Sequence, residues 1–128
     1  MTQFDYTIET KKNLEDAVAA IEANTKEKGF RVLVTHDVSQ MLNEKGFPIE
    51  PIKIIEICNA KYANQVLAKD IKIALMLPCP ISVYEKSGKT YISALKPSII
   101  SSFYPDADIE VIAQEVENIV VEIVNLSK

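Results

Sequence analysis

The sequence lacks tryptophan and holds only one histidine, two cysteines and three glycines among its 128 residues. The glycines are too dispersed to form a loop that cradles phosphate, and neither a G-x-S-x-G nor an H-E-x-x-H motif is present. A single histidine leaves few residues for general acid–base catalysis or a catalytic triad. These shortages weigh against a conventional enzyme, although they leave thiol chemistry open.

Basic residues are also in short supply. The 14 lysines and arginines are outnumbered by 18 aspartates and glutamates, which gives a net charge of −4 and an isoelectric point near 5.0. No basic run is longer than the pair Lys11 and Lys12, so the chain lacks the electrostatic footprint of a nucleic-acid-binding protein. We therefore expect no nucleic-acid partner.

Long apolar runs are missing as well. The longest, at 73–81, reaches about half of the roughly 20 residues that cross a bilayer, and two prolines interrupt its end. Residues 1–6 are polar and acidic where a secretory signal would be basic and then apolar. Two cysteines in such a chain are expected to be reduced thiols. The sequence thus predicts a cytoplasmic protein with no membrane partner.

What the sequence does contain is the composition of one ordinary globular domain. Apolar residues make up 48% and charged residues 25%, with a mean hydropathy of +0.05. A chain of this length can bury about two-thirds of its unfolded surface. No flexible linker divides residues 1–128, so we expect a single domain.

The spacing of apolar residues predicts strands and helices in alternation. Strands are expected at 3–10, 30–36, 52–58 and 71–77, followed by a hairpin that turns at Gly88. Helices are expected from Asn13 to Gly29, as a short segment ending at Gly46, over 59–69, as a turn within 97–105, and from Asp106 or Asp108 to about residue 125. This order predicts an α+β domain of two layers.

Two of these segments have unusual patterns. The strand at 52–58 is apolar on both sides apart from Lys53 and Glu56, which favours a place inside the sheet. The C-terminal helix has an apolar face wider than one core needs, and we interpret the extra width as a surface for a second copy of the chain. Residues 119–124 also have strong β propensity, so a strand-like end is the alternative there.

The two cysteines carry the sharpest chemical signal, because Cys58 and Cys79 each fall at the predicted end of an apolar strand. If these strands are parallel, both thiols lie at one edge of the sheet, where open α/β sheets often bind ligands. If the strands are antiparallel, the thiols lie at opposite ends and a shared site fails. Cys58 would also sit beside the N-terminus of the helix capped by Asn59, which can lower a thiol pKa.

Three interpretations of the cysteines stay open. They are inert core thiols, a functional thiol acting as nucleophile, redox pair or sulfur carrier, or a soft-metal or cofactor site that uses both. The twenty-one-residue spacing of Cys58 and Cys79 matches no zinc motif. His36 is a weaker candidate, as a third ligand or a base, and a surface histidine at a strand end is the simpler interpretation. No particular metal or cofactor is indicated.

Several segments together resemble a known family. They are Gly29-Phe30, Lys45-Gly46, Ile57-Cys58-Asn59, and Leu75-Met76-Leu77-Pro78-Cys79 followed by Val83-Tyr84-Glu85. In this order they resemble the bacterial and archaeal domain-of-unknown-function family numbered three hundred and two, over about residues 4–126. One departure is Ala60, where the family typically has proline, which leaves the first turn of the helix at 59–69 less rigid. His36 matches no family signature.

The resemblance implies an α+β sandwich like that of the TATA-binding-protein-like group, with a mainly antiparallel sheet, helices packed on it and commonly a homodimer. It implies no DNA binding, because a fold does not fix a function and this chain is acidic. It favours the antiparallel arrangement, which weakens the case for a shared thiol site. The family has no established activity, so Cys58 and Cys79 carry over only as signature positions.

The leading hypothesis is a small cytoplasmic ligand-binding or interaction domain without catalysis, homodimeric and with an unidentified small ligand. The alternative is a thiol-based protein that uses Cys58 and Cys79. The candidate site residues are therefore Cys58, Asn59 and Cys79, with His36 as the weaker candidate.

Overall fold

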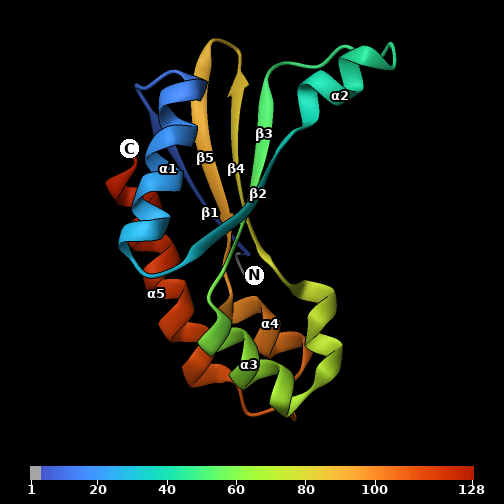
Figure 1. Ribbon diagram of the computed structural model, residues 1–128, viewed down its shortest axis with the longest axis vertical. Helices are drawn as coiled ribbons and strands as arrows, with labels where there is room; N and C mark the ends of the chain where they lie inside the picture. Colours follow the sequence, from blue (N-terminus) through green and yellow to red (C-terminus); the bar gives the residue numbers. More distant parts are fainter. Residues whose placement is uncertain (1–3) are drawn as a thin grey trace.

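The computed structural model describes residues 4–128 and has two layers, a five-stranded sheet and helices packed on one of its faces (Figure 1). In chain order the elements are β1 (Asp5–Thr10), α1 (Leu14–Glu27), β2 (Arg31–Asp37), α2 (Val38–Glu44), β3 (Ile52–Cys58), α3 (Ala60–Lys69), the 3₁₀ helix η1 (Ile71–Met76), β4 (Cys79–Lys86), β5 (Lys89–Leu95), α4 (Ser98–Phe103) and α5 (Glu110–Leu126). The strand order is β1-β5-β4-β3-β2, and every neighbouring pair is antiparallel. The predicted α+β class and the C-terminal helix are confirmed.

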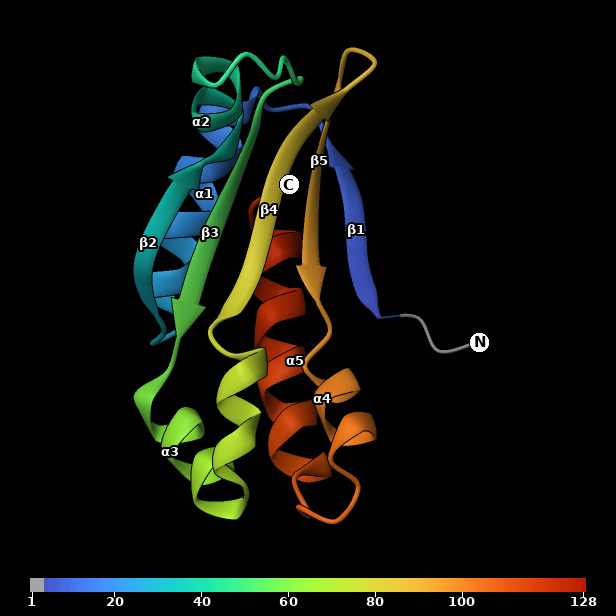
Figure 2. The same ribbon diagram turned by 90° about the vertical axis from the view of Figure 1, so that its right-hand side faces the viewer.

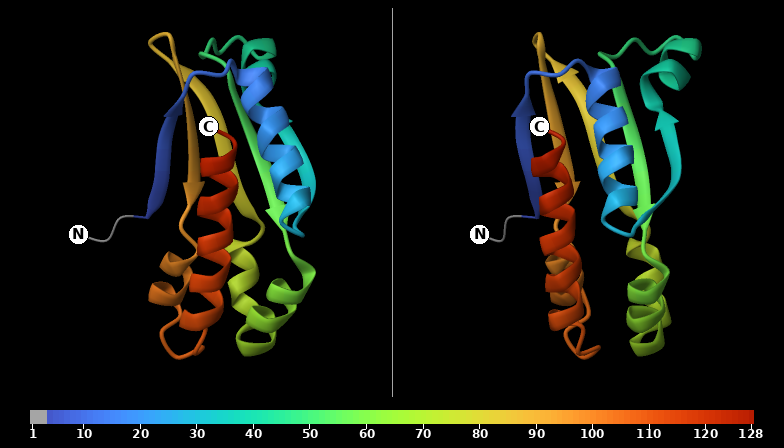
Figure 3. Two further views of the ribbon diagram at one scale, coloured as in Figure 1. Left: turned by 90° about the vertical axis from the view of Figure 1, so that its left-hand side faces the viewer. Right: turned by 60° about the vertical axis from the view of Figure 1, so that its left-hand side comes forward.

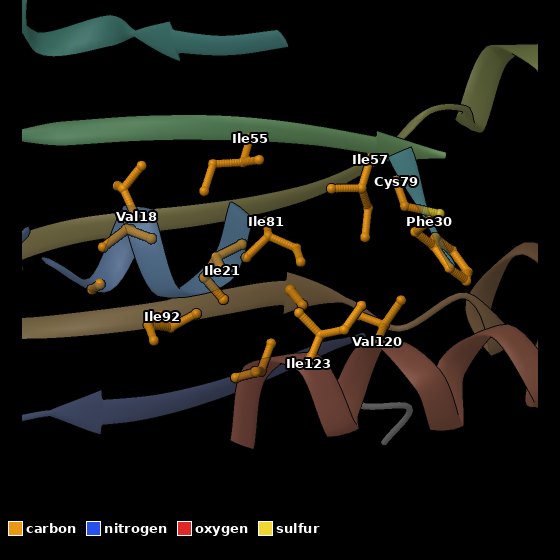
Figure 4. Close-up of a cluster of buried hydrophobic side chains, with 14 of the residues drawn as sticks. Val18, Ile21, Phe30, Ile55, Ile57, Cys79, Ile81, Ile92, Val120 and Ile123 are labelled. Carbon is orange, nitrogen blue, oxygen red and sulfur yellow. The ribbon is translucent and has the colours of Figure 1, made fainter. Parts of the chain in front are cut away.

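Helices α1 and α5 lie side by side over one face of the sheet (Figure 3), whereas on the other side of the described chain only the short helix α2 projects, near one end of β3 (Figures 1 and 2). Because strand side chains alternate between the two faces, every second residue points at these helices. Ile55, Ile81 and Ile92 from three neighbouring strands are fully buried there. Ile21 of α1 and Ile123 of α5 meet them (Figure 4). Burial of each such side chain contributes roughly 1.5–3 kcal/mol, so this cluster holds the two layers together.

Local signals set the ends of several elements as the sequence predicts. Asn13 caps α1, since its side-chain oxygen accepts a hydrogen bond from the backbone N–H of Asp16. Gly29 follows the helix at φ +81°, a conformation that glycine adopts without strain. The β4–β5 hairpin turns on Ser87 and Gly88, both with positive φ, as tight two-residue turns require.

A second apolar cluster lies beyond the end of the sheet, among α3, η1, α4 and the first turns of α5. Its buried members include Val66, Ile73, Ile100 and Ile109. Helix α5 has 17 residues and is about 26 Å long, so one half packs in this cluster and the other half on the sheet (Figure 2). Most of the wide apolar face of α5 is therefore buried within the chain. Val111 is one of the few apolar residues of this helix that stay exposed.

The predicted strand at 71–77 is wrong. These residues form η1 instead. Asp70 caps the start of η1, because its side chain accepts a hydrogen bond from the backbone N–H of Lys72. Only Ile73 of η1 is buried, whereas Leu75 is 84% exposed, so this apolar run does not fill a place in the sheet. Consequently β3 and β4 are direct neighbours, joined by α3 and η1. β3 has a strand on each side, as its apolar residues predict.

Helix α5 and strand β1 differ from the predictions at their ends. The cap of α5 is Ile109, without a side-chain hydrogen bond, rather than Asp106 or Asp108. Because Ile109 is buried, packing in the second cluster decides where this helix begins. The helix continues to Leu126, so the strand-like alternative at 119–124 does not occur. β1 begins at Asp5, and residue 3 of the predicted strand lies outside the described residues.

Candidate functional site

The two cysteines lie at the same end of the sheet. β3 ends at Cys58, and β4 begins at Cys79, which pairs with Ile57 in the antiparallel ladder. The expectation that antiparallel strands would separate the thiols is wrong, because it assumed that Cys79 follows a strand at 71–77 instead of beginning the next one. Both signature cysteines therefore reach the junction between the sheet and the helices beyond it.

A cavity lies at this junction, between the two apolar clusters. Its volume is about 40 Å³, more than the roughly 10–15 Å³ that one water molecule needs. The walls include Phe30, Ile57, Cys58, Asn59 and Cys79 at the end of the sheet, and Tyr62, Val66, Ile73, Leu77, Ile100, Ile112 and Val116 from the helical part. None of the residues that line the cavity carries a charge.

Cys79 is the more buried of the two thiols, with 8% of its surface exposed. Burial raises the pKa of the Cys79 thiol to about 11, and the charge of a nearby Cys58 thiolate adds to the rise. At neutral pH Cys79 is therefore an uncharged thiol. It packs as a small apolar side chain beside Phe30 and Ile57 (Figure 4).

Cys58 is half-buried, and neither cysteine forms a disulfide within residues 4–128. Ile57 and Cys79 are paired and share the core face of the sheet. Cys58 directly follows Ile57 on β3, so the alternation of side chains along the strand places Cys58 on the opposite face. Both cysteines nevertheless border the cavity. Of the two, Cys58 is the thiol that reagents from solvent reach more easily.

Asn59 has a structural role at the cavity wall. Its side-chain oxygen caps α3 by accepting a hydrogen bond from the backbone N–H of Tyr62 at 3.2 Å. Its amide nitrogen donates to the carbonyl of Gly29 at 3.1 Å, which ties α3 to the turn before β2. These bonds hold the rings of Phe30 and Tyr62 near one another, with centroids 6.2 Å apart. The predicted cap is confirmed, and its polar atoms are already engaged.

His36 lies away from the cysteines. It sits opposite Ile54 in the β2–β3 ladder, four residues before Cys58, which is about 13 Å along a strand. Its Nε2 atom lies 2.7 Å from the Glu56 carboxylate on the sheet surface. Across the described chain no group of three or more histidine, cysteine, aspartate or glutamate side chains is arranged to hold a metal ion. The structure thus separates His36 from Cys58 and Cys79.

Most of the cavity wall was not predicted. Phe30, Tyr62, Leu77, Ile100 and Val116 come from five distant segments, and each reads in the sequence as an ordinary core residue. Only the cysteines stood out by residue type. The convergence depends on α3 and η1 folding back over the sheet end, which no local pattern encodes.

These features define a two-layer α+β domain in which an insertion between two antiparallel strands forms part of the wall of an apolar, thiol-bordered cavity. A search among curated proteins finds no match to the chain. The family model described as "Domain of unknown function DUF302" matches residues 6–126, so the chain belongs to the DUF302 family.

A solved relative agrees with this assignment. The chain is similar to the crystal structure of an uncharacterised conserved DUF302 protein from Bacillus stearothermophilus, with a TM-score of 0.94 and 28% sequence identity. The match covers 99% of this chain and 100% of the other. Within residues 4–128, no helix has both the length and the apolar character needed to cross a membrane.

Proposed function

We propose that this protein binds a small uncharged, mainly apolar ligand in the cavity between the sheet and the helices. The observation that carries the proposal is a cavity lined without a single charged side chain, between the two apolar clusters of the domain. Protein interiors rarely leave such space, and an apolar void favours an apolar guest over water. The small volume selects a compact molecule or the apolar end of a longer one.

Binding of propane tests the proposal, with propionate as its charged counterpart. We expect propane to shift the amide NMR signals of Val66 and Val116, and propionate to leave them unchanged, because no cation in the cavity wall would compensate a buried carboxylate. The variant Ala63→Leu fills the cavity from α3, while Ala19→Leu adds the same atoms on the exposed side of α1. The proposal fails if propane leaves the signals unmoved, or if A63L binds it as well as A19L does.

We also propose that the protein is a homodimer that forms through the β2 edge. The apolar width of α5 does not support this, because that face is mostly buried inside the chain. Support comes from five exposed apolar side chains along β2, α2 and the segment after it, namely Leu33, Val34, Met41, Phe47 and Ile49. β2 is also an edge strand with free backbone groups. A two-fold pairing of two β2 strands would cover both features.

Sedimentation velocity tests the dimer. We expect a dimer at micromolar concentration and a monomer after Val34→Lys, because a lysine on the edge strand opposes pairing. Phe103→Ser is the matched control, since Phe103 is also exposed but lies on α4, away from β2. A monomer at high concentration in the unaltered protein would remove this part of the proposal.

Thiol chemistry at Cys58 is the second candidate. It is supported by two free cysteines at the border of one cavity, an arrangement in keeping with a reducing compartment such as the cytoplasm. The raised pKa of Cys79 favours Cys58 as the reacting group. Alkylation rates of the Cys58→Ser and Cys79→Ser variants test this. If both single thiols react only after unfolding, the protein has no thiol function.

A further inference from the structure

The β4–β5 hairpin borders the bare face of the sheet (Figure 2). Its register places an ordered set of side-chain pairs there. In the register of this hairpin, Lys86 faces Lys89 and Tyr84 faces Tyr91. The two tyrosine rings stack, with centroids 5.6 Å apart and planes inclined by 25°. All four side chains belong to the face opposite α1 and α5, because their neighbours in the alternation are core residues. The cations and the aromatic rings are therefore adjacent on open surface.

A chain of hydroxyl groups holds the tyrosine pair in place. The Tyr84 hydroxyl lies 3.1 Å from the Ser93 hydroxyl, which in turn lies 2.8 Å from the hydroxyl of Thr7 on β1. These bonds cross three neighbouring strands, so the ring of Tyr84 has little freedom to turn. A ring that is fixed before binding loses little entropy when a ligand stacks on it.

The lysine pair has no strong counter-ion. Like charges directly opposite one another destabilise a sheet, yet Lys86 forms no ion pair with any residue in 4–128. Lys89 has only Glu9, at 3.9 Å and with both side chains more than half exposed. Glu50 accepts a hydrogen bond from the backbone N–H of Ser87 in the turn, and Glu85 precedes Lys86 on β4, where strand alternation places it on the other face. An anion between the two ammonium groups would relieve their repulsion.

We propose that this surface binds a small planar aromatic anion, with its ring packed against the stacked pair Tyr84 and Tyr91 and its anionic group between Lys86 and Lys89. An open surface hollow of about 380 Å³ is lined by these four residues with Thr7 and Ser87. The tyrosine and lysine pairs are two residues apart along the strands, or about 7 Å. That distance fits one ring that carries a phosphate or carboxylate. The site lies on the opposite face from the helices and is independent of the cavity.

Three probes separate the two contributions, namely phenyl phosphate, phenol and inorganic phosphate. NMR titration of the labelled protein is expected to show phenyl phosphate shifting the signals of Tyr91 and Lys89 at the lowest concentration. Phenol should bind more weakly because it lacks the charge, and inorganic phosphate because it lacks the ring. Added salt should weaken phenyl phosphate binding and leave phenol unaffected.

Variants make the test decisive. The double variant Lys86→Gln with Lys89→Gln should bind phenyl phosphate about tenfold more weakly, since two exposed charge contacts are lost, and should bind phenol as before. The control pair Lys45→Gln with Lys72→Gln removes two exposed lysines elsewhere and should change nothing. The proposal is overturned if phenyl phosphate binds no better than inorganic phosphate, if both double variants weaken it equally, or if a second copy of the chain covers these residues in solution.

Discussion

The buried thiol of Cys79 predicts a measurable loss of stability at alkaline pH. Its pKa is about 11 in the folded chain and near 9.0 for an ordinary cysteine, so the folded state keeps a proton that the unfolded state releases. The resulting stabilisation is fully present below pH 9 and is lost as the pH rises toward 11. A pKa difference of two units lowers the free energy of unfolding by about 3 kcal/mol well above pH 11, and by about 1 kcal/mol at pH 10.

Urea unfolding at pH 7.5 and pH 10 measures this loss in the unaltered protein and in Cys79→Ala. The alanine variant should be less stable at pH 7.5 by about 1 kcal/mol, because a small cavity replaces the sulfur. Both proteins should lose stability between pH 7.5 and pH 10. The decrease in the free energy of unfolding should be about 1 kcal/mol smaller in the alanine variant than in the unaltered protein. All other ionisable groups are common to both proteins, so their effects cancel in the comparison.

Cys58→Ser serves as the second control, because it keeps the buried thiol while removing the neighbouring one. Since burial is the larger cause of the raised pKa and the Cys58 charge the smaller, this variant should retain most of the alkaline loss. Equal losses in the unaltered protein and Cys79→Ala would refute the reasoning, and would mean that Cys79 ionises in the folded chain as readily as in water.

Other substitutions test the supports around the site. In a urea titration, Asn59→Ala should lower the free energy of unfolding by about 1–2 kcal/mol, because it removes the α3 cap and a hydrogen bond to the turn before β2. The control Asn64→Ala, at an exposed position on the same helix, should have little effect. Ile81→Ala should cost about 2–5 kcal/mol in thermal or urea unfolding, against less than about 0.5 kcal/mol for the exposed Val111→Ala. His36→Gln should change stability by less than about 1 kcal/mol, since its contact with Glu56 is at the surface, and a larger loss would contradict the role assigned to it.

Sequence patterns predicted those parts of the fold that depend on local chemistry. The Asn13 cap, Gly29 after α1 and Gly88 in the hairpin each act within a few residues, through one side-chain bond or one backbone angle. The wrong prediction of a strand at 71–77 also came from a local pattern. Its unbroken apolar run suits a buried strand, and periodicity alone does not separate that from a short helix. Asp70 was the available signal, as a helix-capping residue directly before the run.

The candidate site was predicted only as three positions, Cys58, Asn59 and Cys79, all of which border the cavity. Cys58 and Cys79 stood out by chemistry, and their common location depends on which strand Cys79 belongs to. The cavity behind them is a property of packing between α3, η1 and α5, and its walls are ordinary core residues such as Val66 and Val116. The Tyr84 and Tyr91 pair was equally hidden, because it depends on the register of the hairpin and on the bare face of the sheet.

The position of β1 has a consequence for how the chain reaches its native state. β1 pairs only with β5, and even its nearest partners, Thr10 and Thr90, are about 80 residues apart in the sequence. During synthesis the first strand must therefore wait until most of the chain has left the ribosome. Closing so long a loop has a high entropic cost, so pairing of β1 is expected late in folding. Until then the β5 edge is open, and an incomplete chain is most exposed to pairing with a neighbour there.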